Sequence, residues 1–207
     1  MKQLELGLLQ NFVYLVGCPQ TKEAAVVDPG WDLGKILAEA KRDGMKITTI
    51  LVTHAHFDHV NALEGLLEKT DAKVYVQKEE VPFLKISKTE LRPVSNGERI
   101  RIGQLDVECI HTPGHTPGSQ CFHVQGNLIS GDTLFINACG RTDLPGGDPE
   151  KLHRSLSRLS QLPDETILYP GHNYAAKPTS TIGEEKKNNP FLLCDSLDTF
   201  LMMLRGF

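Results

Sequence analysis

Four metal-competent side chains fall within six consecutive residues of this chain: His54, His56, Asp58 and His59. Imidazole and carboxylate groups in one place suit zinc, iron or manganese, and thiolate ligands are not needed. In an extended segment alternate side chains point to the same side, so His54 and His56 can meet one ion. Asp58 and His59 turn the other way, where a second ion could bind. The motif therefore predicts a metal site rather than a solvated polar loop.

Three more candidate ligands lie in loops farther along the chain, each soon after an expected strand. They are His115 in Thr-Pro-Gly-His-Thr-Pro-Gly, Asp132 in Gly-Asp-Thr and His172 in Pro-Gly-His. A single histidine is more often a hydrogen-bonded structural residue than a ligand. Because strand ends converge on one edge of an α/β layer fold, we expect all of these side chains to meet there.

Apolar periodicity and turn residues predict a mixed set of strands and helices that would position these loops. The expected strands cover residues 11–16, 24–27, 47–52, 73–76, 99–102, 105–110, 120–124, 128–130 and 166–169. The expected helices begin at Asp32, near Leu63, at Asp148 and at Asn189-Pro190, the last running to about Leu204. The β-branched run 47–52, which leads into His54, is typical of a strand buried on both faces.

The composition excludes several classes of protein. Hydrophobic residues make up 40% of the 207 residues, and 26 acidic against 22 basic side chains give a net charge of −4. A protein that binds a nucleic-acid backbone normally carries a basic face, so no nucleic-acid partner is expected. No apolar run approaches the ~20 residues of a membrane span, so we expect no membrane partner and a cytoplasmic location. The length favours a single domain over residues 1–207.

Cysteine usage agrees with a reducing compartment. The five cysteines are odd in number and widely spaced, without a Cys-x-x-Cys pair. This pattern argues against a disulfide framework and against a thiolate zinc site. Only Cys139 is singled out, because it lies in the irregular stretch 138–147 and such loops tend to carry function.

Four motifs together resemble a known family. T-H-x-H-x-D-H, H-T-P-G-H-T-P-G-S, S-G-D-T-L-F and P-G-H occur in this order across nearly the whole chain. They are similar to the motifs of the metallo-beta-lactamase superfamily. The resemblance implies a fold of the α/β (α+β) class: an αβ/βα sandwich of two mixed β-sheets face to face, with helices outside and metals at one rim.

The same resemblance implies a ligand set and a reaction. His54, His56 and His115 would hold one ion, Asp58, His59 and His172 a second, and Asp132 would bridge the two. The expected cofactors are one or two divalent ions, zinc and/or iron, with manganese as a further candidate. A hydroxide held between the ions would attack an activated carbonyl, with Asp58 and Asp132 as the catalytic carboxylates.

Some branches of the superfamily do not fit these residues. A flavo-diiron protein would have Glu in place of His56, and the best-known zinc β-lactamases would have Cys in place of Asp132. Extended nucleases carry an added domain, whereas lactonases share the ligands and are not excluded. The best match is the short glyoxalase II-like (hydroxyacylglutathione hydrolase-like) branch, which implies hydrolysis of a thioester such as an acylated glutathione.

Persulfide dioxygenase is the alternative, with one non-haem iron held by His54, His115 and Asp132. The segments 139–143 and 180–190 resemble that branch closely. A third hypothesis is a metal-binding module without activity. For either enzyme the expected partner is a small thiol-derived substrate, such as a glutathione conjugate, and the chain is a monomer or a homodimer. The expected substrate contacts are Cys139, Arg141, Thr142 and Tyr174, with Arg141 binding a glutathione carboxylate or forming a salt bridge within its loop.

Overall fold

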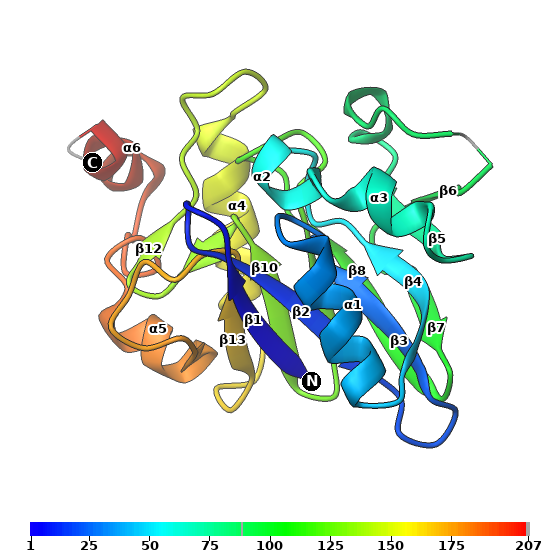
Figure 1. Ribbon diagram of the computed structural model, residues 1–207. Coiled ribbons are helices and arrows are strands. Elements are labelled where there is room, and N and C mark those ends of the chain that lie inside the picture. The colour runs from blue at the N-terminus through cyan, green and yellow to red at the C-terminus, as the bar shows by residue number, and fades with distance from the viewer. Residues whose placement is uncertain (88, 206–207) are drawn as a thin grey trace.

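The computed structural model describes residues 1–87 and 89–205, whose strands form two six-stranded sheets and one small hairpin (Figure 1). The first sheet has the order β1-β2-β3-β4-β5-β6, antiparallel from β1 to β3 and parallel from β3 to β6. Its strands are β1 (Lys2–Leu6), β2 (Asn11–Gly17), β3 (Glu23–Val27), β4 (Lys46–Leu51), β5 (Lys73–Gln77) and β6 (Leu91–Val94).

The second sheet has the order β14-β13-β10-β9-β8-β7, and its parallel pair is β10 with β13. Its strands are β7 (Arg99–Ile102), β8 (Leu105–His111), β9 (Gln120–Val124), β10 (Asn127–Gly131), β13 (Ile167–Pro170) and β14 (Ser180–Thr181). The hairpin pairs β11 (Leu134–Phe135) with β12 (Ala138–Cys139). Both sheets are mixed, as the family resemblance predicts.

Short helices connect the strands. They are α1 (Leu33–Arg42), α2 (Phe57–Val60), α3 (Leu63–Leu67), α4 (Pro149–Leu159), α5 (Ile182–Asn188) and α6 (Leu197–Arg205), with a 3₁₀ turn η1 at Val81–Phe83. The predicted caps Asp32 and Asp148 are confirmed, because each side chain accepts a hydrogen bond from the backbone three residues later. Within residues 1–87 and 89–205, no helix is long and apolar enough to span a bilayer.

Strand β2 shows how the sheet separates two apolar layers. All residues from Asn11 to Val16 are buried. Side chains alternate between the faces of a strand, so Val13 and Leu15 pack with the helices while Phe12 and Tyr14 pack toward the second sheet. A strand buried on both faces must be apolar at nearly every position, which is why β2 and β4 were recognisable in the sequence.

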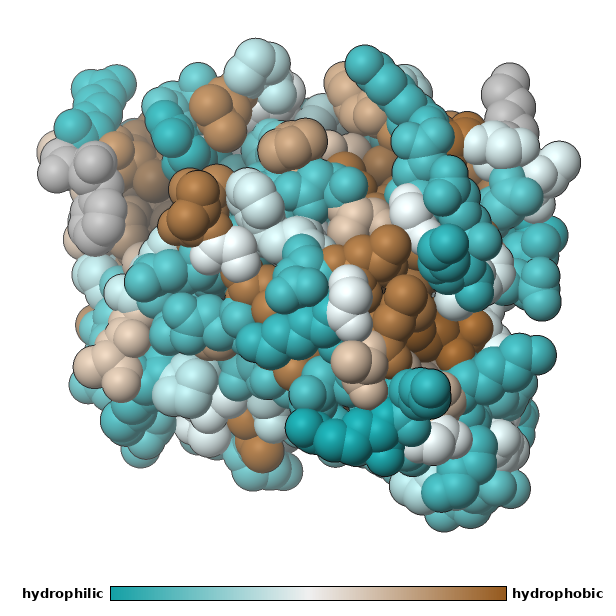
Figure 2. Space-filling view, in the orientation of Figure 1, coloured by the Kyte–Doolittle hydropathy of each residue, from teal (hydrophilic) through white to brown (hydrophobic). Residues whose placement is uncertain are grey.

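Three apolar layers hold the sandwich together. The first lies between the first sheet and α1 and α3, the second between the sheets, and the third between the second sheet and α4 to α6. In Figure 1, α1 lies in front of the first sheet and α4 behind the second. Figure 2 shows a largely hydrophilic surface on the front, with hydrophobic side chains gathered beside α1. The predicted αβ/βα sandwich is confirmed.

The predicted C-terminal helix is wrong in its limits. In the structure α5 ends at Asn188, just before Asn189-Pro190, and α6 begins only at Leu197. Thr181 starts α5, because its hydroxyl accepts a hydrogen bond from the Glu184 backbone. Thr-x-x-Glu is a helix-start signature, and a proline shortly after a helix marks its end.

Candidate metal centre

The strands that lead into the candidate ligands end at one edge of the sheets, and helix α2 lies at this edge near the top of Figure 1. Strand β4 ends at Leu51 and leads into the histidine-rich segment, and β10 ends directly before Asp132. Strand β13, which is parallel to β10, ends at Pro170 shortly before His172. The chain after β4 differs from the expected extended loop, because Phe57–Val60 forms the one-turn helix α2.

The first cluster consists of His54, His56 and His115, with one nitrogen of each lying within 4.8 Å of the others. The Nε2 of His115 lies 3.0 Å from Nδ1 of His56, and the rings of His54 and His56 are 4.7 Å apart between centroids. His54 is 1% exposed and His115 is 2% exposed. Three imidazoles therefore converge in a buried place, as predicted from the sequence.

The second cluster consists of Asp58, His59 and His172, again with ligand atoms within 4.8 Å of one another. The Nε2 atoms of His59 and His172 lie 3.2 Å apart, and each lies 3.5 Å from Oδ2 of Asp58. The short helix α2 places Asp58 and His59 on this side, away from His56. This group also matches the prediction.

Asp132 lies between the clusters. Its carboxylate oxygens are 3.3 Å from Nε2 of His59 and of His172, and 3.7 Å from Nε2 of His115. Two glycines let the chain pass this close: a Cβ on Gly140 would lie 1.8 Å from the carbonyl oxygen of Asp132, and one on Gly171 would lie 2.2 Å from its Oδ1. Any other residue at these positions would displace Asp132.

Two buried polar atoms at this site have no hydrogen-bond partner, namely Nε2 of His54 and Oδ1 of Asp132. An unpaired buried polar atom is costly, so each such atom calls for an explanation. Both are ordinary ligand atoms for divalent ions, and both lie among other nitrogen and carboxylate donors. The donor set therefore fits one or two divalent cations.

Four of the five candidate histidines have a hydrogen-bond partner on Nδ1, which leaves their Nε2 atoms available as ligands at the centre. A partner on the far nitrogen fixes the tautomer and the ring orientation of a metal-binding histidine. The partners are Thr53 Oγ1 for His54, Asp28 Oδ2 for His59, the Arg141 carbonyl for His115 and the Leu9 carbonyl for His172, at 2.8–3.0 Å. Backbone and side chains thus prepare the imidazoles before any ion binds.

Asp28 is a site residue that the sequence reasoning missed. Its carboxylate accepts hydrogen bonds from the backbone and hydroxyl of Thr53 and contacts Nδ1 of His59 at 3.0 Å. Its φ of 50° lies in the left-handed region, which Asp tolerates better than most residues. The Asp-Pro-Gly sequence was interpreted only as a turn, although an acid at the end of a buried strand was a usable signal.

Asn11 was also missed. It is 1% exposed, and its Nδ2 donates a hydrogen bond of 2.8 Å to Oδ2 of Asp58. Its Oδ1 accepts one of 2.8 Å from Nε1 of Trp31. Nothing in the sequence links residue 11 to residue 58, because the contact depends on β2 lying beside α2. Asn11 holds the carboxylate that the second cluster needs.

The two clusters differ in their electrostatics. Burial and the neighbouring histidines lower the pKa of His54 and His56. Burial alone would also lower the pKa of His59 and His172, but Asp132, together with Asp28 in the case of His59, raises it. Burial opposes ionisation of Asp132, yet the surrounding histidines hold its pKa well below the usual value. Negative charge is therefore concentrated at Asp132 and the second cluster.

The expected substrate contacts lie around the centre. Cys139, Arg141 and Thr142 line a cavity of about 440 Å³ together with Phe191 and Leu204. Burial raises the pKa of Cys139, which therefore carries a protonated thiol rather than a thiolate. The ring of Tyr174 stacks on His172 at 4.7 Å between centroids and 10° between planes.

Arg141 forms an ion pair within its own loop. Its Nε and one terminal nitrogen donate hydrogen bonds of 2.6 Å to the two oxygens of Asp143. Both side chains are more than 60% exposed. The sequence left open whether Arg141 binds a substrate carboxylate or forms a salt bridge within its loop, and the structure contains the salt bridge. A substrate carboxylate would have to replace Asp143 at this guanidinium.

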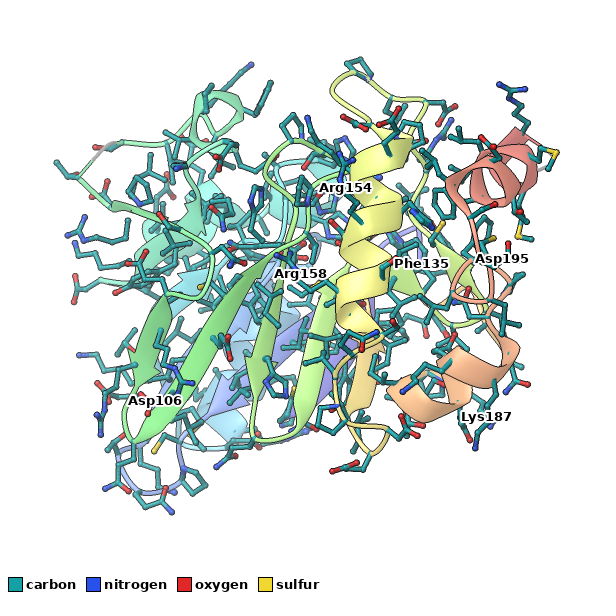
Figure 3. The ribbon with its side chains drawn as sticks, turned by 180° about the vertical axis from the view of Figure 1, so that it is seen from behind. Asp106, Phe135, Arg154, Arg158, Lys187 and Asp195 are labelled. Carbon is teal, nitrogen blue, oxygen red and sulfur yellow. The ribbon has the colours of Figure 1, made fainter. Side chains whose placement is uncertain are left out.

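The segment 180–190, which resembles persulfide dioxygenase, supports the β11–β12 hairpin. The buried side chain of Glu185 accepts hydrogen bonds from the Asn137 backbone, Ser180 and Asn189. Asn189 in turn donates to the carbonyls of Phe135 and Ala138. Seen from behind, the labelled Phe135 lies on the side of α4 that faces the C-terminal helices (Figure 3). The tail thus fixes the hairpin that follows Asp132.

Comparison with known proteins assigns the chain to a family. The Metallo-beta-lactamase superfamily pattern matches residues 6–172, which include all seven candidate ligands. The chain therefore belongs to the metallo-beta-lactamase superfamily, and the resemblance seen in its motifs is confirmed.

Three similar proteins are informative. A hydroxyacylglutathione hydrolase from Pseudomonas fluorescens (strain SBW25) is 39% identical over 166 residues, which are 79% of this chain and 62% of that protein. The structure of ETHE1 from Myxococcus xanthus has a TM-score of 0.90 and 31% identity, and the match covers 99% of this chain and 89% of that chain. TTHA1623 in a di-iron-bound form has a TM-score of 0.81 and 38% identity, covering 93% and 100%. These similarities and the donor clusters support a hydrolase of this superfamily with a divalent-metal centre.

Proposed function

We propose that the protein hydrolyses the thioester of a small thiol, such as an acylated glutathione, at a centre that holds two divalent ions. The observation that carries this proposal is the second cluster. Asp58, His59 and His172 converge beside the three imidazoles of the first cluster, and a one-metal enzyme does not need them. The similarity to a hydroxyacylglutathione hydrolase supports the thioester, and the similarity to a di-iron protein supports two ions.

In this proposal the seven side chains divide as the sequence predicts. His54, His56 and His115 would hold one ion, and Asp58, His59 and His172 would hold the other. Asp132 would serve both, since its oxygens lie between the Nε2 atoms of the two clusters. A divalent ion bound there lowers the pKa of a coordinated water from 15.7 to about 7 and polarises a carbonyl.

The chain's own residues then orient the attacking water and accept its proton. Asn11 fixes Oδ2 of Asp58, and the other oxygen of this carboxylate takes the proton of the attacking water. The C–O bond forms at the carbonyl carbon, the C–S bond then breaks, and the proton taken by Asp58 passes to the departing thiolate, which leaves as the thiol.

The substrate contacts are assigned to the rim of the centre. Arg141 exchanges Asp143 for a carboxylate of the thiol portion, a bidentate contact that guanidinium suits. Thr142 and the neutral thiol of Cys139 line the same cavity. Tyr174 stacks on His172, and the residue is 62% exposed to solvent. In this proposal its ring contacts the side of the substrate opposite Arg141.

The test measures metal content and thiol release on the same preparation. We expect about two divalent ions per chain and release of free thiol from acylated glutathione, with loss of turnover in a chelator and recovery on adding metal. Metal-loaded protein that releases thiol from no thioester overturns the proposal.

Persulfide dioxygenase activity is the second candidate, favoured by the structural match to ETHE1. It would use one iron, held by His54, His115 and Asp132. Oxygen uptake separates the two enzymes, because thioester hydrolysis consumes none. A single iron per chain and oxygen consumption with glutathione persulfide would defeat the hydrolase proposal.

A further inference from the structure

An apolar recess of about 240 Å³ opens beside the first cluster. Its walls include Ala55, Phe83, Pro117 and Pro145, and His56 forms the side that faces the cluster. Phe83 is 59% exposed, so it lies at the surface of the recess rather than inside the core. Because His56 is part of the recess, the reactive part of any bound substrate lies at its mouth.

The polar groups of the recess are already paired. Glu80 is 1% exposed, and its carboxylate accepts hydrogen bonds from the Ala55 backbone, the Thr116 hydroxyl and the Gly118 backbone, at 2.6–2.9 Å. A paired carboxylate asks for no polar partner from a ligand. The recess is therefore suited to an apolar group.

The recess differs from the cavity at Arg141. The loop 140–147 contributes to both, with Arg141 and Asp143 on the cavity of about 440 Å³ and Pro145 on the recess. The cavity thus carries an exposed ion pair, whereas the recess carries prolines, a phenyl ring and a carboxylate that is already hydrogen-bonded within the protein. A volume of about 240 Å³ is below the ~300–1,000 Å³ of pockets for whole small ligands, so it suits a substituent.

We propose that this recess binds the acyl chain of the thioester, so that the enzyme prefers aliphatic acyl groups of several carbons. The inference rests on the proposed thioester hydrolysis. The scissile carbonyl lies at the clusters, its acyl chain passes His56 into the recess, and the thiol portion stays outside. Burial of each methylene is worth about fourfold in affinity or rate.

The experiment uses thioesters of one thiol with acetyl, propionyl, butyryl and hexanoyl groups and metal-loaded protein. We expect kcat/KM to rise about fourfold per added methylene and to level off once the recess is full. Phe83→Ala removes one wall of the recess, so the rise of kcat/KM in this variant should fall below about twofold per methylene, while its metal content stays near that of the parent. Phe83→Leu should restore most of the dependence on chain length.

Leu193→Ala is the matched control, because it removes an exposed apolar side chain that does not line the recess. This variant should keep the full rise of kcat/KM with acyl-chain length. Hydrolysis of all four thioesters at rates independent of chain length, or an unchanged rise in Phe83→Ala, overturns the acyl recess and leaves the proposed function standing. Hydrolysis of none of them overturns the proposed function and the recess together.

Discussion

The two ligand clusters differ in what they are made of. The first consists of three imidazoles, whereas the second contains two imidazoles and the Asp58 carboxylate. Asp132 lies between them, closer to the second, with distances of 3.3 Å against 3.7 Å to the nearest nitrogens. A protonated histidine and a divalent ion compete for the same negative charge, so ion binding at the second cluster displaces protons.

The clusters also differ in what holds them. The first is oriented by Thr53 and the Arg141 carbonyl. The second depends on Leu9, Asn11 and Asp28, all from the first three strands and their turns. Leu9 and Asn11 thus act on the second cluster, whereas Asp28 contacts His59 of the second cluster and also holds Thr53, which orients His54 of the first. Variants can therefore separate the two sites, which gives an order of expected effects.

Asp132→Ala should have the largest effect, because this residue contacts both clusters. Loss of a partner outside the ligand shell costs about 10- to 100-fold, and loss of a shared ligand should exceed that. We expect metal content and thioester hydrolysis to fall together, as measured by elemental analysis and thiol release. Circular dichroism serves as the control for folding, and full activity in this variant would show that Asp132 is not the bridge.

The seven donors were predictable because each follows a strand whose apolar run is visible in the sequence. Strand ends meet at one edge whatever the loops between them do, so His54, Asp132 and His172 converge. Asp28 also follows a buried strand and could have been found in the same way, but Asn11 could not. The role of Asn11 depends on which elements are neighbours, and the sequence contains no local pattern that encodes the contact of β2 with α2.

The C-terminal part was the least predictable portion of the fold. The Asn189-Pro190 pair was interpreted as a helix start, but Asn189 instead donates to two carbonyls of the β11–β12 hairpin. Phe200, in the last helix, is fully buried against Phe191 and His153. Both outcomes follow from tertiary packing, which a single helix pattern does not contain.

Asp28→Asn should weaken the second site more than the first, because Asp28 contacts His59 directly and reaches His54 only through Thr53. Asn is nearly isosteric and tolerates φ of 50°, so the backbone should persist. Its NH₂ group would face the Thr53 hydroxyl and Nδ1 of His59, which favours the tautomer that carries its proton on the metal-facing nitrogen. We expect roughly 10- to 100-fold weaker binding of the second ion. Titration with metal should show one tight site remaining, and two unchanged sites would exclude an orienting role for Asp28.

Asn11→Ala should act in the same direction but less strongly, since it frees Asp58 without removing a ligand or changing a tautomer. The second ion should bind about tenfold more weakly, near the lower end for an outer partner. Ion binding at the first cluster is the internal control, because Asn11 does not contact it. Equal weakening of both sites would indicate a general loss of structure, and no weakening would show that Asp58 holds its position unaided.

Arg141→Ala should have the smallest effect. It should distinguish the role of the Arg141 backbone from the role of its side chain. The Arg141 carbonyl contacts His115 and survives the substitution, so metal content should not change. The side chain is exposed and paired with Asp143, and exposed ion pairs contribute little, so KM should rise only about two- to fivefold with kcat nearly constant. Asp143→Ala frees the guanidinium for substrate and should lower KM. An unchanged KM in Arg141→Ala would remove this residue from the substrate site, whereas loss of metal would show that the loop depends on its ion pair to hold His115.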